Sequence, residues 1–308
     1  MDYYGSNSNV FVRLNTSIGF TMREAINFGY LPEEHSNPED AGIVIIPVAY
    51  DGTSTWLKGA DKGPAAILEA SANMELYDIE TDSEVFKKGI FTEETIGGEI
   101  TTKEMVEAVT ETTTYYLEKN KFTVVIGGEH SVSIGSIKAH TEQYKKLTVL
   151  QLDAHSDLRE EYNGSKFNHA CVMARAREIC PVVQVGIRSM DYSEKKSLDT
   201  SKVFFAEDIH DSSDWIKKVI SKLSDNVYIT IDLDVFDPSI MPSTGTPEPG
   251  GLLWYDVLAL LKAVAAKKNI VGFDVVELCP GEENKAPDFL AAKLIYKLLS
   301  YKFELNHK

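Results

Sequence analysis

Short apolar runs alternate with amphipathic stretches from residue 43 almost to the end of the chain. The first run is continuously apolar, which is typical of a strand buried on both faces of a parallel sheet. The runs predict strands at residues 43–48, 122–126, 147–152, 182–187, 203–205, 227–231 and 270–276. The stretches between them predict helices from residue 63, after residue 131, and at residues 101–119, 213–224, 252–267 and 288–302. This alternation favours an α/β fold with a mainly parallel sheet, either open or closed into a barrel.

Residues 1–40 do not share this alternation. They contain Asn, Ser, Gly and Pro, a modest amphipathic piece at residues 18–26, and an acidic stretch at residues 33–40. We expect them to form an N-terminal arm that lies on the domain or on a neighbouring subunit. Residues 41–308 contain no low-complexity linker and no internal repeat, so they are expected to form a single domain.

Composition narrows the possible partners and the compartment. A formal net charge of -16 argues against nucleic acid or an anionic membrane as partner, and it is compatible with a small cationic molecule. No apolar run approaches the roughly 20 residues that span a bilayer, and the first residues lack the features of a secretion signal. Cys171, Cys180 and Cys279 have no C-x-x-C spacing, as expected of reduced thiols. We therefore expect a cytoplasmic protein.

Candidate chemistry is concentrated where the expected strands end. Asp153, His155 and Asp157 stand at alternate positions directly after the strand at residues 147–152. Carboxylates and imidazoles are ligands for divalent cations, and this spacing places three of them at one edge. Other expected strands end in the same kind of residue, namely His130, Asp232, Asp234 and Glu277. Loops at the carboxyl ends of parallel strands share one face, so we expect all these side chains to meet there.

So many ionisable groups directly after apolar strands require compensation for their burial and mutual repulsion. Two imidazoles and four aspartates suit two metal ions bridged by shared carboxylates, at a separation of roughly 3.5–4 Å. An oxygen-rich set without thiolates favours manganese, while the imidazoles leave zinc, cobalt, iron and nickel open. Two such ions would activate a water molecule for hydrolysis near neutral pH. The candidate metal ligands are His130, Asp153, His155, Asp157, Asp232 and Asp234.

These motifs resemble the metal-binding signatures of the ureohydrolases, the arginase and agmatinase family. The matching segments are Gly127–Ser131, Asp153–Asp157 and Asp232–Ser239, and residues 245–252 resemble a further family block. The resemblance covers roughly residues 41–300, with the signatures in the order of the family. It implies an arginase-like three-layer α/β/α fold, a binuclear manganese centre, and hydrolysis of a guanidino group to urea and an amine.

The resemblance also implies roles for individual residues. It places one manganese ion on His130, Asp153, Asp157 and Asp232, and the second on Asp153, His155, Asp232 and Asp234. Asp153 and Asp232 would then bridge the two ions, with Asp157 belonging to the catalytic centre. Glu277 matches the carboxylate that holds the substrate guanidinium, to which a carboxylate can offer a bidentate pair of acceptors. His169 matches the proton-shuttling histidine, a task suited to an imidazole.

Without the metal motifs, two of these residues would have ordinary interpretations. His169 would suit a surface position at a helix start, and Glu277 an ion pair of purely structural function. We expect packing functions for Cys171 and Cys279, since thiols near apolar residues are usually inert. His140 lacks any motif and is expected at the surface, like His210.

Residues 158–171 resemble the agmatinase branch more than the arginases, so agmatine, cleaved to urea and putrescine, is the first expected substrate. Thr246 and Asn163 are candidate substrate contacts, and Glu160 and Glu161 are expected to attract the distal ammonium of agmatine. Asn168 and the segment Leu57–Lys58 depart from the usual family residues near the expected substrate tail. Aminopropylagmatine, guanidinobutyrate, arginine and formiminoglutamate are therefore alternative substrates.

Two alternatives come from other functional classes. One is a catalytically silent protein of the same fold that binds metal or polyamine. The other is a single-metal amide hydrolase related to the deacetylases, for which one metal per chain would be expected instead of two. The family resemblance further implies a homo-oligomer, either a trimer or a hexamer, that acts on a small cationic guanidino compound.

Overall fold

A computed structural model describes residues 27–305, and its strands form one 9-stranded sheet. The strand order is β2-β1-β4-β9-β8-β5-β6-β7, with β3 paired to β1, and the paired strands are parallel. Because β2 and β7 end the order, the sheet is open and the barrel is excluded. The strands are β1 Ile43–Ala49, β2 Ile90–Thr92, β3 Ile96–Gly97, β4 Phe122–Gly127, β5 Leu147–Leu152, β6 Val182–Ile187, β7 Val203–Phe205, β8 Asn226–Asp232 and β9 Asn269–Val276.

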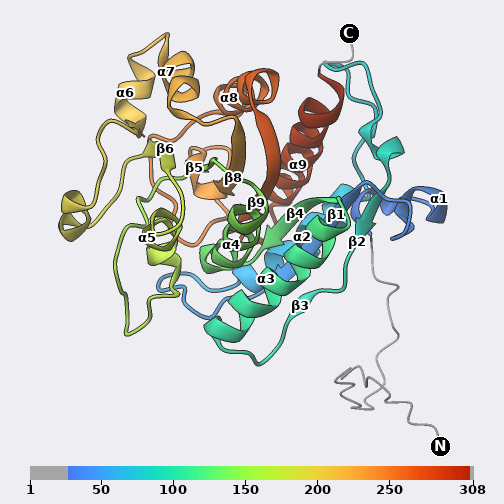
Figure 1. Ribbon diagram of the computed structural model, residues 1–308, viewed down its shortest axis with the longest axis horizontal. Coiled ribbons are helices and arrows are strands. Elements are labelled where there is room, and N and C mark those ends of the chain that lie inside the picture. Colours follow the sequence, from blue (N-terminus) through green and yellow to red (C-terminus); the bar gives the residue numbers. More distant parts are fainter. Residues whose placement is uncertain (1–26, 306–308) are drawn as a thin grey trace, which may run out of the picture.

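Helices cover both faces of the sheet, as Figure 1 shows. Two separate apolar clusters fill the space between the sheet and its helices, one on each face. One face carries α2 Gly63–Ser71, α7 Trp215–Lys222, α8 Trp254–Lys267 and α9 Ala286–Glu304, and the other carries α3 Thr102–Glu118, α4 Ser133–Gln143 and α5 Val172–Arg177. Two further short helices are α1 Glu33–Ser36 and α6 Ala206–His210. The expected three-layer α/β/α architecture is confirmed.

The expected strands are all present, but the sequence missed β2 and β3. Both are very short and lie beside polar residues, so they produce no apolar run. Of the expected N-terminal arm, residues 27–40 lie on the domain: Phe28 is fully buried, and its main-chain N–H donates to Thr92 Oγ1 at 2.9 Å. The amphipathic piece at residues 18–26 lies outside the described residues. Within residues 27–305, no helix is both long and apolar enough to cross a membrane.

The end of β4 is tied closely to its neighbours at Gly128. The main-chain N–H of Glu277 donates to Gly128 O at 2.8 Å, and that of Glu129 donates to Tyr50 O at 2.9 Å. A Cβ atom at Gly128 would lie 1.9 Å from Tyr50 O, so no side chain fits there. The glycine therefore allows the strand ends that carry His130 and Glu277 to approach each other.

The expectation that His140 lies at the surface is wrong. This residue is fully buried on α4, where Nδ1 lies 2.8 Å from Ser136 O and Nε2 lies 3.2 Å from Thr123 Oγ1. Burial disfavours the charged imidazolium and lowers the pKa of His140 to about 4. This burial could not be predicted from the sequence, because a polar residue on a helix is normally assigned to its exposed face.

We predict that replacing His140 with glutamine reduces the acid sensitivity of the fold. The folded-state pKa lies below the ordinary value, so the stabilising contribution is complete above about pH 6.5 and is lost as the pH falls towards 4. Between pH 7.5 and 4, the wild type should lose about 3 kcal/mol more of its free energy of unfolding than His140→Gln does. Urea unfolding at both pH values measures this difference, and equal losses in the two proteins would refute the prediction.

Candidate active site

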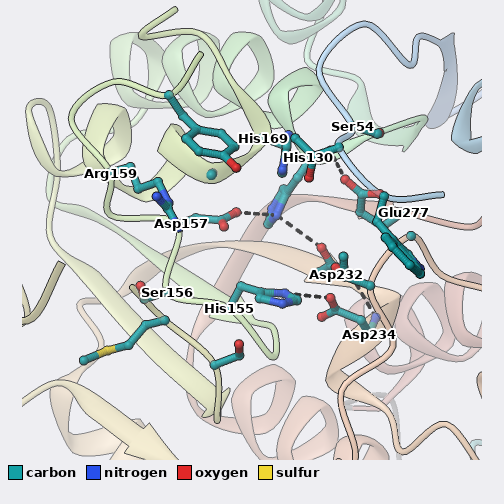
Figure 2. Close-up of a pocket in the computed structure, with 18 of the residues that line it drawn as sticks. Ser54, His130, His155, Ser156, Asp157, Arg159, His169, Asp232, Asp234 and Glu277 are labelled. Atoms are coloured by element: carbon teal, nitrogen blue, oxygen red, sulfur yellow. Dashed lines mark hydrogen bonds and ion pairs between the residues drawn. The ribbon is translucent and has the colours of Figure 1, made fainter. Parts of the chain in front are cut away.

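Most of the predicted site residues meet at the carboxyl ends of β4, β9, β8 and β5, which are neighbours in the middle of the sheet. Figure 2 shows these side chains converging from separate strand ends on one pocket. Asp153 lies fully buried beside them. The pocket has a volume of about 180 Å³, which suits a small molecule. The predicted site residues that line it are His130, His155, Asp157, His169, Asp232, Asp234, Thr246 and Glu277.

His130 forms the centre of a first cluster of possible metal ligands. Its Nδ1 lies 3.2 Å from Asp153 Oδ2, 3.0 Å from Asp157 Oδ2 and 3.4 Å from Asp232 Oδ2. None of these contacts has the geometry of a hydrogen bond, so within residues 27–305 this buried nitrogen has no hydrogen-bond partner. An unpartnered imidazole nitrogen among converging carboxylate oxygens is what a metal-binding histidine requires.

The orientation of the His130 ring is fixed by a hydrogen bond on the side of Nε2, opposite the carboxylates. Thr230 Oγ1 donates to Asp274 Oδ1 at 2.6 Å, and Tyr228 OH donates to Asp274 Oδ2 at 2.6 Å. Because the Thr230 hydroxyl proton is used in this way, its oxygen accepts from Nε2–H of His130 at 2.9 Å. The proton on Nε2 leaves the Nδ1 lone pair free to face the carboxylates, an arrangement common among metal-binding histidines.

A second cluster is formed by Asp153, His155 and Asp234. His155 Nδ1 lies 2.8 Å from Asp234 Oδ2 and 3.7 Å from Asp153 Oδ1. Asp153 therefore presents one oxygen to each cluster, as a carboxylate that bridges two metal ions would. The other predicted bridge, Asp232, directs Oδ2 towards His130, while its Oδ1 accepts from the main-chain N–H of Asp234 at 2.9 Å.

The carboxylates of this centre repel one another. Burial, followed by the charge of Asp153, raises the pKa of Asp157 to about 7. Burial, followed by the charge of Asp234, raises the pKa of Asp232 well above its ordinary value. Bound positive charge would relieve this repulsion and keep the carboxylates ionised. The donor set and the orphaned Nδ1 of His130 therefore fit divalent cations.

Glu277 lies beside the first cluster in a strained conformation. Its φ of 67° is in the left-handed region, as is the φ of 51° at Asp157, and non-glycine residues with such angles are often found at functional sites. Glu277 Oε1 accepts from the main-chain N–H of His130 at 2.7 Å. Burial, followed by the charge of Glu129, raises the pKa of Glu277 well above its ordinary value. A guanidinium ion would supply both the positive charge and the planar donors that this carboxylate lacks.

His169 is held by a residue that the sequence analysis missed. Its Nδ1 lies 3.0 Å from Thr53 Oγ1, and its main-chain N–H donates to the same oxygen at 3.0 Å. Burial disfavours the charged imidazolium and lowers the pKa of His169 to about 4. Its imidazole is therefore neutral near pH 7 and can accept a proton before passing it on. Thr53 lies 116 residues away in the chain, so no local pattern could have paired it with His169.

The structure does not bring three of the predicted substrate contacts into the pocket. Asn163, Glu160 and Glu161 are exposed and are not among the residues that line it. Glu160 instead forms an ion pair with Arg175, with 3.1 Å between Oε2 and Nη2. Besides the metal ligands and Glu277, two carboxylates that were not predicted line the pocket, namely Asp191 and Glu194, which follow β6.

We predict that the double variant Glu160→Gln/Glu161→Gln leaves KM for the expected guanidino substrate within about twofold of wild type, because exposed charges outside the pocket contribute little. Asp191→Asn is the matched comparison, since it removes a carboxylate that lines the pocket, and it should raise KM. Steady-state urea release measures both constants. A large increase in KM for the double variant alone would show that the substrate tail leaves the pocket towards Glu160.

Comparison with known proteins identifies the family. The arginase family matches residues 41–300. A protein of Synechocystis sp. named N(1)-aminopropylagmatine ureohydrolase is 37% identical over 284 residues, which covers 87% of this chain and 92% of that protein. The agmatinase of Pyrococcus horikoshii is 31% identical over 264 residues, covering 85% of this chain and 92% of that protein. The crystal structure of the agmatine ureohydrolase of Thermoplasma volcanium has a TM-score of 0.83 and 30% sequence identity, covering 92% of this chain and 96% of that one.

An open parallel sheet with His/Asp clusters at its carboxyl edge and a buried glutamate beside them defines a hydrolase of guanidino compounds. The chain belongs to the arginase family, and the expected resemblance is confirmed. The reaction class of a ureohydrolase follows from this membership. The two clusters are the candidate ligands for the metal on which the family depends.

Proposed function

We propose that the protein hydrolyses N1-aminopropylagmatine to urea and spermidine at a binuclear manganese centre. The observation that carries the proposal is the pair of His/Asp clusters that share Asp153, with Glu277 directly beside them. The name of the Synechocystis relative supports this substrate over agmatine, because that protein is 37% identical and the agmatinase of Pyrococcus horikoshii is 31% identical. Agmatine, the substrate first expected from the sequence, becomes the second candidate.

Each group of side chains has a separate role in the proposed reaction. Two manganese ions held by the clusters would supply an activated water molecule and Lewis acidity. Glu277 binds and orients the guanidinium through Oε2 and the free lone pair of Oε1, next to the cluster of His130. Hydrolysis forms a C–O bond to the guanidino carbon and breaks its C–N bond to the alkyl amine. His169, with Nδ1 turned to Thr53, passes a proton through Nε2 to the leaving amine.

The pocket wall beyond the reacting group suits a polyamine tail. Trp56, Tyr162 and Met190 contribute apolar and aromatic surface, against which methylene groups can pack. Asp191 adds a carboxylate whose pKa is lowered by hydrogen bonds from Ser193, so it is ionised near neutral pH. Alternating methylene segments and ammonium groups match this alternation of apolar surface and negative charge.

The experiment compares kcat/KM for urea release from aminopropylagmatine and agmatine, with guanidinobutyrate and arginine as further guanidino substrates. Formiminoglutamate is tested by formamide release, because its formimino group cannot yield urea. We expect aminopropylagmatine to be the best substrate by a factor of about two to five, since Asp191 is exposed and a contact between exposed charges is weak. A preference for agmatine would favour the second candidate. Metal binding without urea from any of the guanidino compounds would overturn the proposal and favour a catalytically silent binding protein.

We also propose that the protein is a homo-oligomer that acts on a small cationic substrate, as the family resemblance led us to expect. Light scattering of the purified protein tests the first part. A mass that matches a single 34.3 kDa chain at micromolar concentration would contradict it.

A further inference from the structure

We propose that Arg188 is a positioning residue that shapes the half of the metal centre formed by His155 and Asp234. Arg188 follows β6 and is half-buried. The inference rests on the proposed two-metal centre, but it does not depend on which guanidino compound is hydrolysed.

The guanidinium of Arg188 donates all its hydrogen bonds to main-chain oxygens. Nη2 donates to Asp234 O at 2.6 Å and to Glu248 O at 2.8 Å, and Nε donates to Pro249 O at 3.1 Å. Nη1 donates to Gly186 O at 3.2 Å. An arginine fork normally meets a carboxylate or a phosphate, which share its geometry. Within residues 27–305, Arg159 and Arg175 form ion pairs with carboxylates, but Arg188 does not. Arg188 therefore holds main-chain carbonyl groups in place instead of pairing with a charge.

These contacts connect Arg188 to a metal ligand from two directions. Its side chain holds the main-chain carbonyl of Asp234, and its own main-chain N–H donates to Ala154 O at 2.8 Å. Ala154 stands between Asp153 and His155, and its N–H donates to Asp234 Oδ1 at 2.9 Å. The result is a closed set of contacts around the second cluster, whose facing side chains, His155 and Asp234, are visible in Figure 2.

The first cluster is held by different groups. The ring of His130 is fixed by Thr230 and, through it, by Asp274. Asp232 belongs to β8 and is paired with Val276 of β9 in the sheet. Arg188 contacts none of these residues through the bonds described above. Loss of its guanidinium therefore loosens Asp234 and leaves several carbonyl groups without a donor, while the surroundings of His130 stay as they are.

The test measures manganese binding instead of turnover. Wild type, Arg188→Gln and Arg188→Lys are dialysed against Mn²⁺, and free and bound metal are determined by elemental analysis and electron paramagnetic resonance. We expect Arg188→Gln to keep one tightly bound ion and to bind the second about 10- to 100-fold more weakly, as loss of an outer-shell partner typically causes. The spectrum of a spin-coupled manganese pair should then disappear at metal concentrations that give it in wild type.

Arg175→Gln is the matched control. Arg175 is buried and, like Arg188, donates to main-chain oxygens, in its case those of Glu160 and Lys166, but it has no hydrogen bond or ion pair to a candidate metal ligand. It should bind both ions as wild type does, even if its thermal stability falls. Should Arg188→Gln fail to fold, Arg188→Lys provides the same comparison, because lysine keeps the charge but cannot form the fork.

Each outcome is decisive. Unchanged binding of both ions in the Arg188 variants, or equal weakening of both, would overturn the positioning role, and so would fewer than two ions in wild type. Two ions in wild type without urea from any guanidino compound would overturn the proposed function alone, because selective loss of the second ion would still support the role of Arg188.

Discussion

A Glu277→Gln variant is expected to keep its bound metal and to lose kcat/KM for urea release by about 10²- to 10⁴-fold. Removing one charge of a buried ion pair costs about 3–5 kcal/mol, and each 1.4 kcal/mol is a factor of ten. Glutamine can still accept the hydrogen bond from the main chain of His130, so the local fold is preserved. Without the negative charge, however, the buried guanidinium has no counter-ion.

Two measurements separate this effect from general damage. Metal content should equal that of wild type, and Glu160→Gln, which removes a carboxylate outside the pocket, should leave kcat/KM almost unchanged. Loss of metal from Glu277→Gln would mean that Glu277 is itself a ligand, contrary to its assignment to the substrate.

His130→Asn is expected to remove metal as well as activity. The variant loses the Nδ1 atom that faces three carboxylate oxygens and also the Nε2–H donor to Thr230. Loss of an outer-shell partner typically weakens metal binding by about 10- to 100-fold, and loss of a direct ligand should weaken manganese binding by more than that. Elemental analysis after dialysis, together with urea release at saturating substrate, measures both effects.

The matched control is His210→Asn, which changes an exposed histidine at the end of α6. It should retain wild-type metal content and activity. If His130→Asn also kept full metal content, the first cluster would not be a metal site, and the orphaned Nδ1 would need another explanation.

The sequence was a good guide to the site because its chemistry follows strand ends. Asp153 and His155 come directly after a buried strand, and in a parallel sheet all such positions share one edge. That edge was therefore predictable without knowing the strand order. The order itself was not, since β4 and β5 follow each other in the chain but are separated in the sheet by β9 and β8.

The contacts that complete the site were harder to foresee. Glu160 is close in sequence to Asp157, but the left-handed backbone at Asp157 redirects the chain, and Arg175 binds the carboxylate of Glu160 outside the pocket. Asp274 could have been found, because it is a charged residue inside an apolar strand, three positions before Glu277. Thr53 could not, since only the folded chain brings its loop to His169.

The central claim is that this pocket holds two metal ions around Asp153, and the manganese content of the purified protein tests it most directly. After removal of metal with a chelator and dialysis against Mn²⁺, elemental analysis should find about two tightly bound ions per chain, as expected for a two-metal hydrolytic site. One ion per chain would favour a single-metal amide hydrolase related to the deacetylases. No bound metal would contradict the account of the site altogether.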